Sequence, residues 1–487
     1  MSKLSHIASK FLLLTLALTA LAFAARDAQT ARGQSAAIEI PKTSAGEQFS
    51  AWMAAFNSGD KDQIEKFRSH FSKPEDHKVE GALGFRQQTG GFDLKKIEEA
   101  SPTKLTGLLE EHDSDQFARF SIEVEAAEPH LVTHLDIRAV ERPAEFSVAR
   151  LSQSDLVTAL RTKLEKDAAT DKFSGAALLA KDGKPIFTGA YGMADREKKI
   201  PNTLNTKFRI GSMNKMFTAV ATLQLVQAGK VSLSDPVGKY ITDYPNQDVA
   251  TKVTIHNLLT HTGLTGDIFG PEYDAHRLEL RRLIDYVALY GKRAPAFEPG
   301  SRYAYSNYGM LLLGVVIERV NDQSYYEYVA DHVYKPAGMT QTGSEPESEA
   351  VPDRSIGYMR PRGGGAWTPN TDTLPYRGTS AGGGYSTVGD LMKFADALMG
   401  HKLLTPESTE LLIAGKVDTG GGRKYAYGFE DGRKDGVGAV GHGGGAPGMN
   451  GDLRIYPQSG YVVAVLSNLD PPAAQQVSAF LDLRLPK

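Results

Sequence analysis

Ser212 and Lys215 form the pair whose residue types and spacing point most directly to chemistry. Residues three apart share one face of a helix, so the lysine amine can reach the serine hydroxyl. Serine is a weak nucleophile at neutral pH, and a lysine whose pKa is lowered by burial or by a neighbouring charge can take its proton. A helix N-terminus also supplies backbone N–H groups where an oxyanion would form. The pair therefore predicts acyl transfer through a covalent serine intermediate.

The Ser-x-x-Lys pattern occurs three times in this sequence, beginning at Ser58, Ser101 and Ser212, and only one occurrence has a context that suits catalysis. Ser58 lies in a turn between two small predicted helices, and Ser101 precedes Pro102 without helical periodicity. Only Ser212 follows a strand-like segment and opens a strongly periodic helix, which we expect to end at Gly229.

Two further motifs could complete such a site. Tyr305 and Asn307 stand directly before an apolar helix that would hold them rigidly. A phenol can shuttle a proton, and an amide can hold both a lysine and a substrate carbonyl. His442 precedes glycines and a strand hairpin, where the missing side chains let a substrate lie against the backbone. Taken singly, each of these residues also fits an ordinary structural role, as a core tyrosine, a turn asparagine or a loop histidine.

The elements that must position these residues fall into two regions. Residues 44–143 contain two amphipathic helices followed by alternating strand-like segments, which predict a small α+β domain. Residues 152–487 begin with a helix and a hairpin whose turn is Asp182-Gly183, and they end with a strand pair and a last helix. Between them, residues 230–345 are mainly helical. This order predicts one sheet assembled from both ends of the region, with a helical insert beside it.

The composition and the N-terminal segment indicate which partners and which cellular compartment to expect. A net charge of −3 gives no reason to bind nucleic acid or an anionic membrane, and the lack of cysteine excludes disulfides and thiolate chemistry. Lys3 and Lys10 precede an apolar run of 14 residues that ends in Ala-Phe-Ala. A bilayer span needs about 20 apolar residues, so we predict a cleaved signal peptide over residues 1–24 and a polar linker over 25–43. We expect a periplasmic or secreted protein without a stable membrane anchor.

In order, these segments resemble the serine β-lactamase and penicillin-binding-protein-like hydrolases: class C β-lactamases, D,D-carboxypeptidases, D-aminopeptidases and related esterases. The likeness covers roughly residues 155–485 and includes "FRIGSMNKMFTAV", "VTIHNLLTHTGL", "EPGSRYAYSNYG" and "GHGGGAPGMNGDLRIYP". It implies a multi-domain α+β protein with a β-lactamase-like antiparallel sheet, flanked by helices, and a helical subdomain. Through "AFNSGDKDQIEKF" and its element order, the region 44–143 resembles the cone-shaped nuclear-transport-factor-2-like (SnoaL-like) domains.

The resemblance implies a role for each motif residue. Ser212 would be the acylated nucleophile, Lys215 its base and Tyr305 the proton shuttle to the leaving group and the deacylating water. Asn307 would hold Lys215 and the substrate. His261 falls in a segment that is usually scaffold in this family. No metal and no organic cofactor are implied.

One departure from the family bears on the substrate. His442 stands where the family has Lys or His, and Gly443 stands where it commonly has a Ser or Thr that helps grip a substrate carboxylate. Gly444 would line the cleft, and the Gly445 N–H would join the Ser212 N–H as an oxyanion hole. The missing hydroxyl and the lack of a permanent cation favour ester or other amide hydrolysis over β-lactam turnover and D-Ala trimming.

The sequence thus predicts an exported serine hydrolase that cleaves an ester or amide through an acyl-enzyme on Ser212. Two alternatives stay open: a β-lactamase or D,D-carboxypeptidase, and a non-catalytic binding protein that keeps the fold. The expected partner is a small-molecule or peptide substrate, and the N-terminal domain either covers one rim of the cleft or pairs two chains as a homodimer. The sequence has no H-E-x-x-H motif and no P-loop motif, which argues against a zinc protease and a P-loop nucleotide enzyme.

Overall fold

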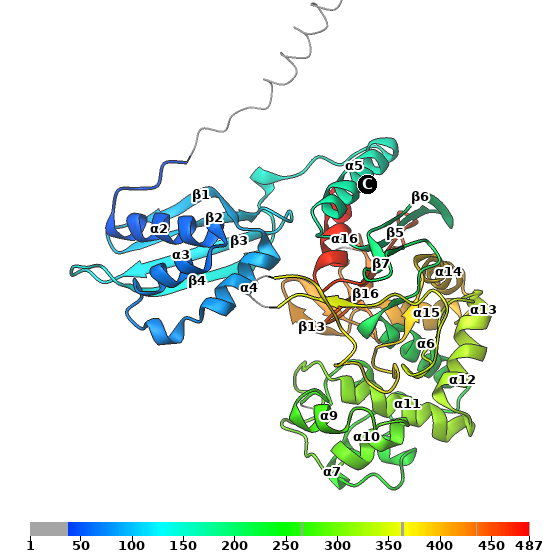
Figure 1. The fold of residues 1–487 in the computed structure, drawn as a ribbon. Helices are drawn as coiled ribbons and strands as arrows, with labels where there is room; N and C mark the ends of the chain where they lie inside the picture. Colours follow the sequence, from blue (N-terminus) through cyan, green and yellow to red (C-terminus); the bar gives the residue numbers. More distant parts are fainter. Residues whose placement is uncertain (1–37, 264–265, 362–364, 435, 487) are drawn as a thin grey trace, which may run out of the picture.

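The computed structural model describes residues 38–486 except 264–265, 362–364 and 435 (Figure 1). The predicted signal peptide and most of the predicted linker lie outside these described residues. Within the described ranges, no helix is both long and apolar enough to cross a membrane.

The N-terminal domain packs helices on a four-stranded antiparallel sheet. The helices are α2 (Ser44–Ser58), α3 (Lys61–Arg68) and α4 (Val79–Thr89), and the strands pair in chain order: β1 (Phe92–Ala100), β2 (Lys104–Glu111), β3 (Phe117–Val124) and β4 (Val132–Val140). The core lies between the two layers, where the Phe49 ring stacks on Phe120 at 4.1 Å. Its resemblance to nuclear-transport-factor-2-like domains stays a prediction.

The turn between the first two helices forms where the sequence predicts it. Gly59 takes a left-handed φ of 65° that ends α2, and the Asp60 side chain then accepts a hydrogen bond from the Gln63 N–H to cap α3. The third helix, α4, has a weak apolar pattern and was not predicted from the sequence.

The second region is built on an eight-stranded sheet whose neighbouring strands all run antiparallel. The strand order is β13-β14-β15-β16-β17-β18-β5-β6. The strands span β5 (Gly175–Lys181), β6 (Lys184–Tyr191), β13 (Val417–Gly420), β14 (Arg423–Tyr425), β15 (Glu430–Asp431), β16 (Val440–Ala446), β17 (Met449–Tyr456) and β18 (Tyr461–Ser467). The predicted hairpin is β5–β6, with Asp182 and Gly183 at φ of 50° and 71°. Because β18 pairs with β5, the sheet joins both ends of the region, which confirms the expected fold class.

Helices cover both faces of this sheet. On one face lie α5 (Gln153–Ala169) and α16 (Ala473–Arg484), whose apolar residues share a core with Val463 and Val465 of β18. On the other face lie α6 (Asn214–Gln227), α14 (Val388–Met399) and α15 (Pro406–Ile413), packed against the alternate residues Val462 and Ala464. Because helices cover both faces of the sheet, consecutive residues of β18 are buried on opposite sides, and the strand is a continuous apolar run in the sequence.

A helical subdomain continues from the second face (Figure 1). It contains α7 (Gln247–Lys252), α8 (Ile255–Leu259), α9 (Pro271–His276), α10 (Leu283–Tyr290), α11 (Asn307–Asn321), α12 (Tyr325–Val329) and α13 (Lys335–Ala337). Three short strand pairs complete the described strands: β7 (Met193–Asp195) with β8 (Ile200–Pro201), β9 (Phe208–Arg209) with β12 (Tyr385–Ser386), and β10 (Tyr358–Met359) with β11 (Thr368–Pro369).

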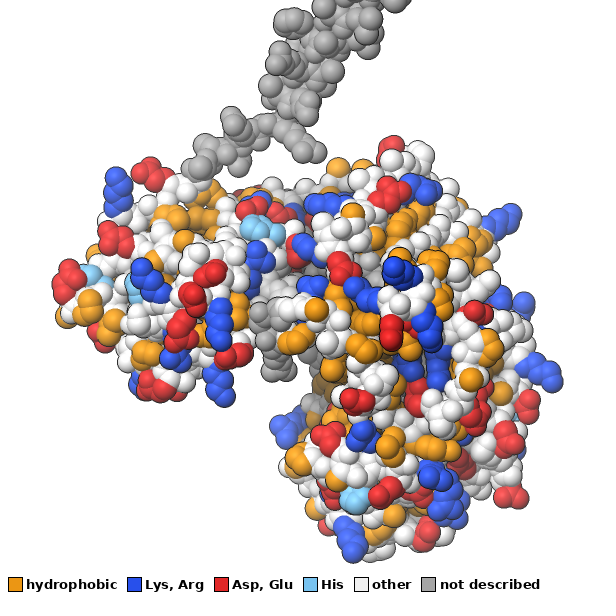
Figure 2. All heavy atoms as spheres, viewed as in Figure 1, with side chains coloured by type: hydrophobic (Ala, Val, Ile, Leu, Met, Phe, Trp, Pro, Cys, Tyr) orange, Lys and Arg blue, Asp and Glu red, His pale blue; other side chains and the backbone are white. Residues whose placement is uncertain are grey.

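The two domains meet at α16, which lies between them in Figure 1. The Arg484 guanidinium donates to both carboxylate oxygens of Asp115, at 2.6 and 3.0 Å. Near the start of the same helix, Gln476 Nε2 donates to the Gln88 carbonyl at 3.2 Å. On the face shown in Figure 2, acidic and basic side chains are interspersed, as the net charge of −3 leads one to expect.

Candidate active site

Three elements bring the predicted motif residues to one place. Ser212 lies in a 3-10 turn, Gly211–Met213, that leads from β9 into α6, and Lys215 is the second residue of α6. Tyr305 and Asn307 stand at the start of α11, which Ser306 caps by accepting a hydrogen bond from the Gly309 N–H. The predicted helix therefore begins two residues after Ser212, because a tight 3-10 turn forms its entrance.

The turn at Ser212 requires glycine before it. Gly211 has a φ of 51°, and a Cβ added there would lie 2.8 Å from the Gly445 backbone nitrogen. In the same way, a Cβ on Gly444 would lie 1.9 Å from the Ile210 carbonyl oxygen. These contacts show that β16 passes directly against the Ser212 turn, which places Gly444 and Gly445 at the nucleophile.

Lys215 Nζ has three oxygen neighbours. They are Ser212 Oγ at 3.0 Å, Asn307 Oδ1 at 2.7 Å and the Ala381 carbonyl at 2.6 Å. The last two can only accept, so a neutral amine gives both of its N–H groups to them and turns its lone pair toward the serine hydroxyl. Burial lowers the pKa of Lys215 to about 7, which makes that neutral form accessible at neutral pH.

Tyr305 approaches Ser212 from a second direction. Its hydroxyl donates to Ser212 Oγ at 2.8 Å, and Lys215 Nζ lies 4.8 Å from the centre of its ring. Burial raises the pKa of Tyr305, so the phenol keeps its proton at neutral pH. Ser212 can therefore accept a hydrogen bond from Tyr305 while it donates its own proton to Lys215.

Asp267 is part of this hydrogen-bond network and was missed by the sequence analysis. Its carboxylate oxygens lie 2.8 and 2.9 Å from Asn307 Nδ2. An aspartate in a loop outside every recognised motif carries no sequence signal that would mark it. Its negative charge raises the pKa of Lys215 and so opposes part of the effect of burial.

His442 lies beside this network and does not hydrogen-bond to it. Tyr425 OH lies 3.1 Å from His442 Nε2 and 3.0 Å from His261 Nε2, and the Ser306 N–H donates to His261 Nδ1. Because His261 Nδ1 accepts, its Nε2–H donates to Tyr425, whose hydroxyl in turn donates to His442 Nε2. His442 then carries its proton on Nδ1 and donates it to the Gly443 carbonyl.

The imidazoles of His261 and His442 are both neutral at neutral pH. Burial lowers the pKa of His442 to about 4 and the pKa of His261 well below its ordinary value, and the nearby Lys215 charge acts in the same direction. The cleft therefore has no permanent cation at the position where the family resemblance allows a lysine. His261, which the sequence analysis assigned to the scaffold, orders the backbone beside Tyr305.

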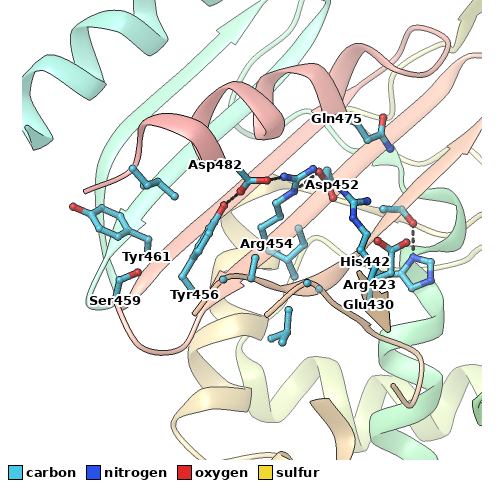
Figure 3. A pocket seen from close by; sticks show the side chains of 18 of the residues that line it. Arg423, Glu430, His442, Asp452, Arg454, Tyr456, Ser459, Tyr461, Gln475 and Asp482 are labelled. Carbon is cyan, nitrogen blue, oxygen red and sulfur yellow. Dashed lines mark hydrogen bonds and ion pairs between the residues drawn. The ribbon is translucent and has the colours of Figure 1, made fainter. Parts of the chain in front are cut away.

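A cavity of about 1350 Å³ opens at the nucleophile. Ser212, Tyr305 and His442 line one part of it, and it continues along β16 and β17 to α16. In that outer part Arg454 bonds the carboxylates of both Asp452 and Asp482 (Figure 3). Among the residues that the structure describes, no three His, Asp or Glu side chains are grouped so that they could hold a metal ion.

The oxyanion position lies between two backbone segments. Within the described residues, the Ser212 N–H donates no hydrogen bond to another part of the chain. The Gly445 nitrogen adjoins the same turn on β16, as the close approach to Gly211 shows. Two backbone N–H groups on rigid elements can stabilise the charge of a tetrahedral intermediate.

Known proteins match the second region of the chain. A family model described as Beta-lactamase matches residues 160–485. The Bacillus subtilis protein PbpX, named as a penicillin-binding protein, is 33% identical over 296 residues, which cover 60% of this chain and 70% of PbpX.

Two solved structures are each similar to about two thirds of the chain. A penicillin-binding protein from Bacillus halodurans is 35% identical with a TM-score of 0.60, and the match covers 66% of this chain and 98% of that one. A D-stereospecific amidohydrolase from Streptomyces is 27% identical with a TM-score of 0.57, and the match covers 67% of this chain and 98% of that one.

Proposed function

Because this chain belongs to the beta-lactamase family and is a serine hydrolase of that fold, we propose that it cleaves an ester or amide through an acyl-enzyme on Ser212. The observation that carries the proposal is the set of partners around Lys215. Asn307 Oδ1 and the Ala381 carbonyl occupy both N–H groups of its neutral amine, which leaves only the lone pair for the serine proton.

In the proposed mechanism, Ser212 Oγ attacks the substrate carbonyl as Lys215 Nζ takes its proton. The N–H groups of Ser212 and Gly445 stabilise the resulting oxyanion. The phenol of Tyr305 then gives a proton to the leaving group, and Lys215 returns one to the resulting phenolate through the network. A water molecule enters where the leaving group was, attacks the acyl-enzyme with the same groups acting as base, and frees Ser212.

The chemistry of the cleft favours neutral acyl groups over substrates that need a grip on a carboxylate. Gly443 offers no hydroxyl, and His442 with its pKa of about 4 offers no positive charge at neutral pH. These features support ester or non-β-lactam amide hydrolysis. The relatives named as penicillin-binding proteins keep β-lactam turnover and D,D-carboxypeptidase activity as the alternative.

The test compares hydrolysis of p-nitrophenyl butyrate by the mature protein and by Ser212→Ala. Loss of a single oxyanion donor would cost about 10²–10³ in rate, and loss of the nucleophile should exceed that. Ser58→Ala is the matched control, since Ser58 begins another Ser-x-x-Lys sequence and is not among the residues that line the cavity. Equal rates in the wild type and Ser212→Ala would overturn the proposal.

Labelling separates the alternatives on the same protein. A fluorophosphonate should add one mass increment to the wild type and none to Ser212→Ala. Turnover of nitrocefin, of the ester and of a D-amino-acid amide then ranks the substrate classes. If the protein shows no turnover of any of these substrates and no labelling, the non-catalytic binding protein is the correct alternative.

We propose in addition that the protein is exported to the periplasm or secreted, with cleavage near residue 25. The support is the positive start, short apolar run and small-x-small end of residues 1–24. N-terminal sequencing of the protein purified from its native cell tests this, and an intact Met1 on the mature protein would contradict it.

A further inference from the structure

A second cavity, of about 590 Å³, lies on the helical subdomain. Among the described residues, none lines both this cavity and the one at Ser212. Residues at the start of α10, on α11 and on α12, all labelled in Figure 1, form most of its wall, and the loop before β12 completes it. Four arginines line the cavity: Arg281, Arg282, Arg319 and Arg377.

Two of these four arginines lack a carboxylate partner. Arg282 and Arg319 each contact an aspartate, at 2.9 and 3.3 Å. Arg281 and Arg377 form no ion pair within the part of the chain that the structure describes. The cavity therefore contains two guanidinium groups whose charge is not matched by a direct contact with an acid.

Both unpaired guanidinium groups are held on aromatic rings. The guanidinium carbon of Arg377 lies 3.5 Å from the centre of the Tyr326 ring, and that of Arg281 lies 5.2 Å from the centre of the Tyr376 ring. Arg377 Nε also donates to the Ser344 carbonyl at 2.7 Å. Stacking occupies the face of a guanidinium, so the terminal N–H groups at its edge stay available to the oxygens of a carboxylate or phosphate.

The two glutamates of the cavity are engaged in helix capping contacts. Glu327 accepts hydrogen bonds from the Ser324 N–H and hydroxyl at the start of α12. Glu318 accepts one from the Tyr325 N–H at 3.2 Å, and burial raises the pKa of Glu318. Burial also raises the pKa of Tyr326, so its hydroxyl keeps its proton in the cavity wall and can donate it.

One wall of the cavity is joined to α6, the helix that carries Lys215. Tyr325, the neighbour of Tyr326 on α12, has its hydroxyl 2.8 Å from Thr218 Oγ1. Thr218 lies three residues after Lys215 and donates to the Ser380 carbonyl at 2.7 Å. A change in the position of α12 is therefore transmitted directly to α6.

Another wall leads to the same lysine along the chain. Arg377 is four residues before Ala381, whose carbonyl accepts a hydrogen bond from Lys215 Nζ at 2.6 Å. This carbonyl occupies one of the two N–H groups of the neutral amine. A ligand that moves Arg377 therefore acts on a group that sets the direction of the lysine lone pair.

We propose that the second cavity is a binding site for a small oxyanion, a carboxylate or a phosphate group, contacted by Arg281 and Arg377, and that its occupancy alters the position of Lys215. The two guanidinium groups supply the charge and the paired N–H donors, and the Tyr326 hydroxyl supplies a neutral donor. Binding at this cavity goes beyond the proposed function and does not require Ser212.

Binding is measured as the rise in Tm with increasing sodium phosphate or sodium acetate, at an ionic strength kept constant with sodium chloride. The anion with the lower apparent Kd distinguishes a phosphate from a carboxylate ligand. Ser212→Ala should bind it as the wild type does, so this result stands even if the proposed function fails.

Arg281→Gln and Arg377→Gln should each raise the apparent Kd about tenfold, the effect of losing one hydrogen bond from a charged group. Arg281→Gln is the more informative variant, because the Arg281 side chain makes no hydrogen bond within the described chain. Arg161→Gln is the matched control: Arg161 also stacks on an aromatic ring, that of Phe187 at 5.4 Å, and lines neither cavity.

The same titration of p-nitrophenyl butyrate hydrolysis tests the link to Lys215. The kcat of the wild type and of Arg161→Gln should change with the anion concentration and level off at the apparent Kd found from Tm. In Arg281→Gln this change should need about tenfold more anion. No rise in Tm beyond that in chloride, or equal binding in Arg281→Gln and the wild type, would overturn the site. Binding that leaves kcat unchanged at saturation would contradict its effect on Lys215.

Discussion

The carboxylate of Asp267 fixes which way the Asn307 amide points. Both of its oxygens lie within 2.9 Å of Asn307 Nδ2, so the amide nitrogen must face Asp267 and the amide oxygen must face Lys215. Without this constraint the amide could rotate and present its N–H₂ group to the lysine, where it would compete with the lysine N–H groups. Asp267 therefore acts on Lys215 through Asn307 as a positioning residue.

Asp267→Asn should lower kcat/KM for a neutral ester by about tenfold to a hundredfold, the cost of a lost hydrogen bond to a charged group. It should also move the activity midpoint to lower pH, because the Asp267 charge raises the pKa of Lys215. A pH profile of the variant measures both effects. A slower enzyme with an unmoved midpoint would mean that Asp267 is only structural.

The pH profile of the wild type should report on Lys215. Its pKa of about 7 means that the neutral base disappears below this pH. We expect kcat/KM for p-nitrophenyl butyrate to rise about tenfold per pH unit below 7 and to level off above it. A profile that keeps rising toward pH 10 would show that the lysine retains its ordinary pKa and would contradict the assignment.

Lys215→Arg should be inactive at every pH from 6 to 9, because a guanidinium stays charged and cannot take the Ser212 proton. The matched control is Lys166→Arg on the exposed side of α5, which should behave as the wild type. Measured turnover in Lys215→Arg above one hundredth of the wild-type rate would assign the base to another group.

Tyr305→Phe should reduce turnover by about 10²–10⁴, the usual contribution of a general acid, since it removes the hydroxyl that lies 2.8 Å from Ser212 Oγ. The loss should be smaller for esters with good leaving groups than for amides, because the leaving amine needs the proton more. Tyr303→Phe is the control, as its hydroxyl does not bond Ser212. Equal losses of turnover in Tyr305→Phe and Tyr303→Phe would contradict the assignment of Tyr305 as the proton donor.

The domain contact at α16 can be opened by Asp115→Arg, which places a positive charge against Arg484. We expect faster proteolysis of the connection at residues 142–151 and unchanged hydrolysis of a small neutral ester, because no N-terminal residue contacts Ser212 in the described chain. Larger substrates and solution mass test the two predicted roles of the N-terminal domain. If deletion of residues 44–143 changes neither kinetics nor mass, both the rim and the homodimer are wrong.

The sequence predicted the parts of this molecule that local patterns encode. Ser212 and Lys215 are three residues apart, and the Asp182-Gly183 turn defines its own hairpin, so both could be recognised without a structure. Asp267 and Tyr425 could not, because each acquires its role only when distant segments meet. Tyr425 links His261 to His442 across three separate elements, and no spacing along the chain reports such a contact.

The pairing of β18 with β5 has a consequence for the order of folding. Tyr461 lies opposite Lys181 and Ser467 lies opposite Gly175, so the centre of the large sheet closes only when β18 is available to pair with β5. Contacts of such sequence separation form late and slowly. During synthesis the centre of the large sheet must therefore stay open until residues 461–467 have been added. An open chain is also the form in which a polypeptide can be threaded through a translocation channel.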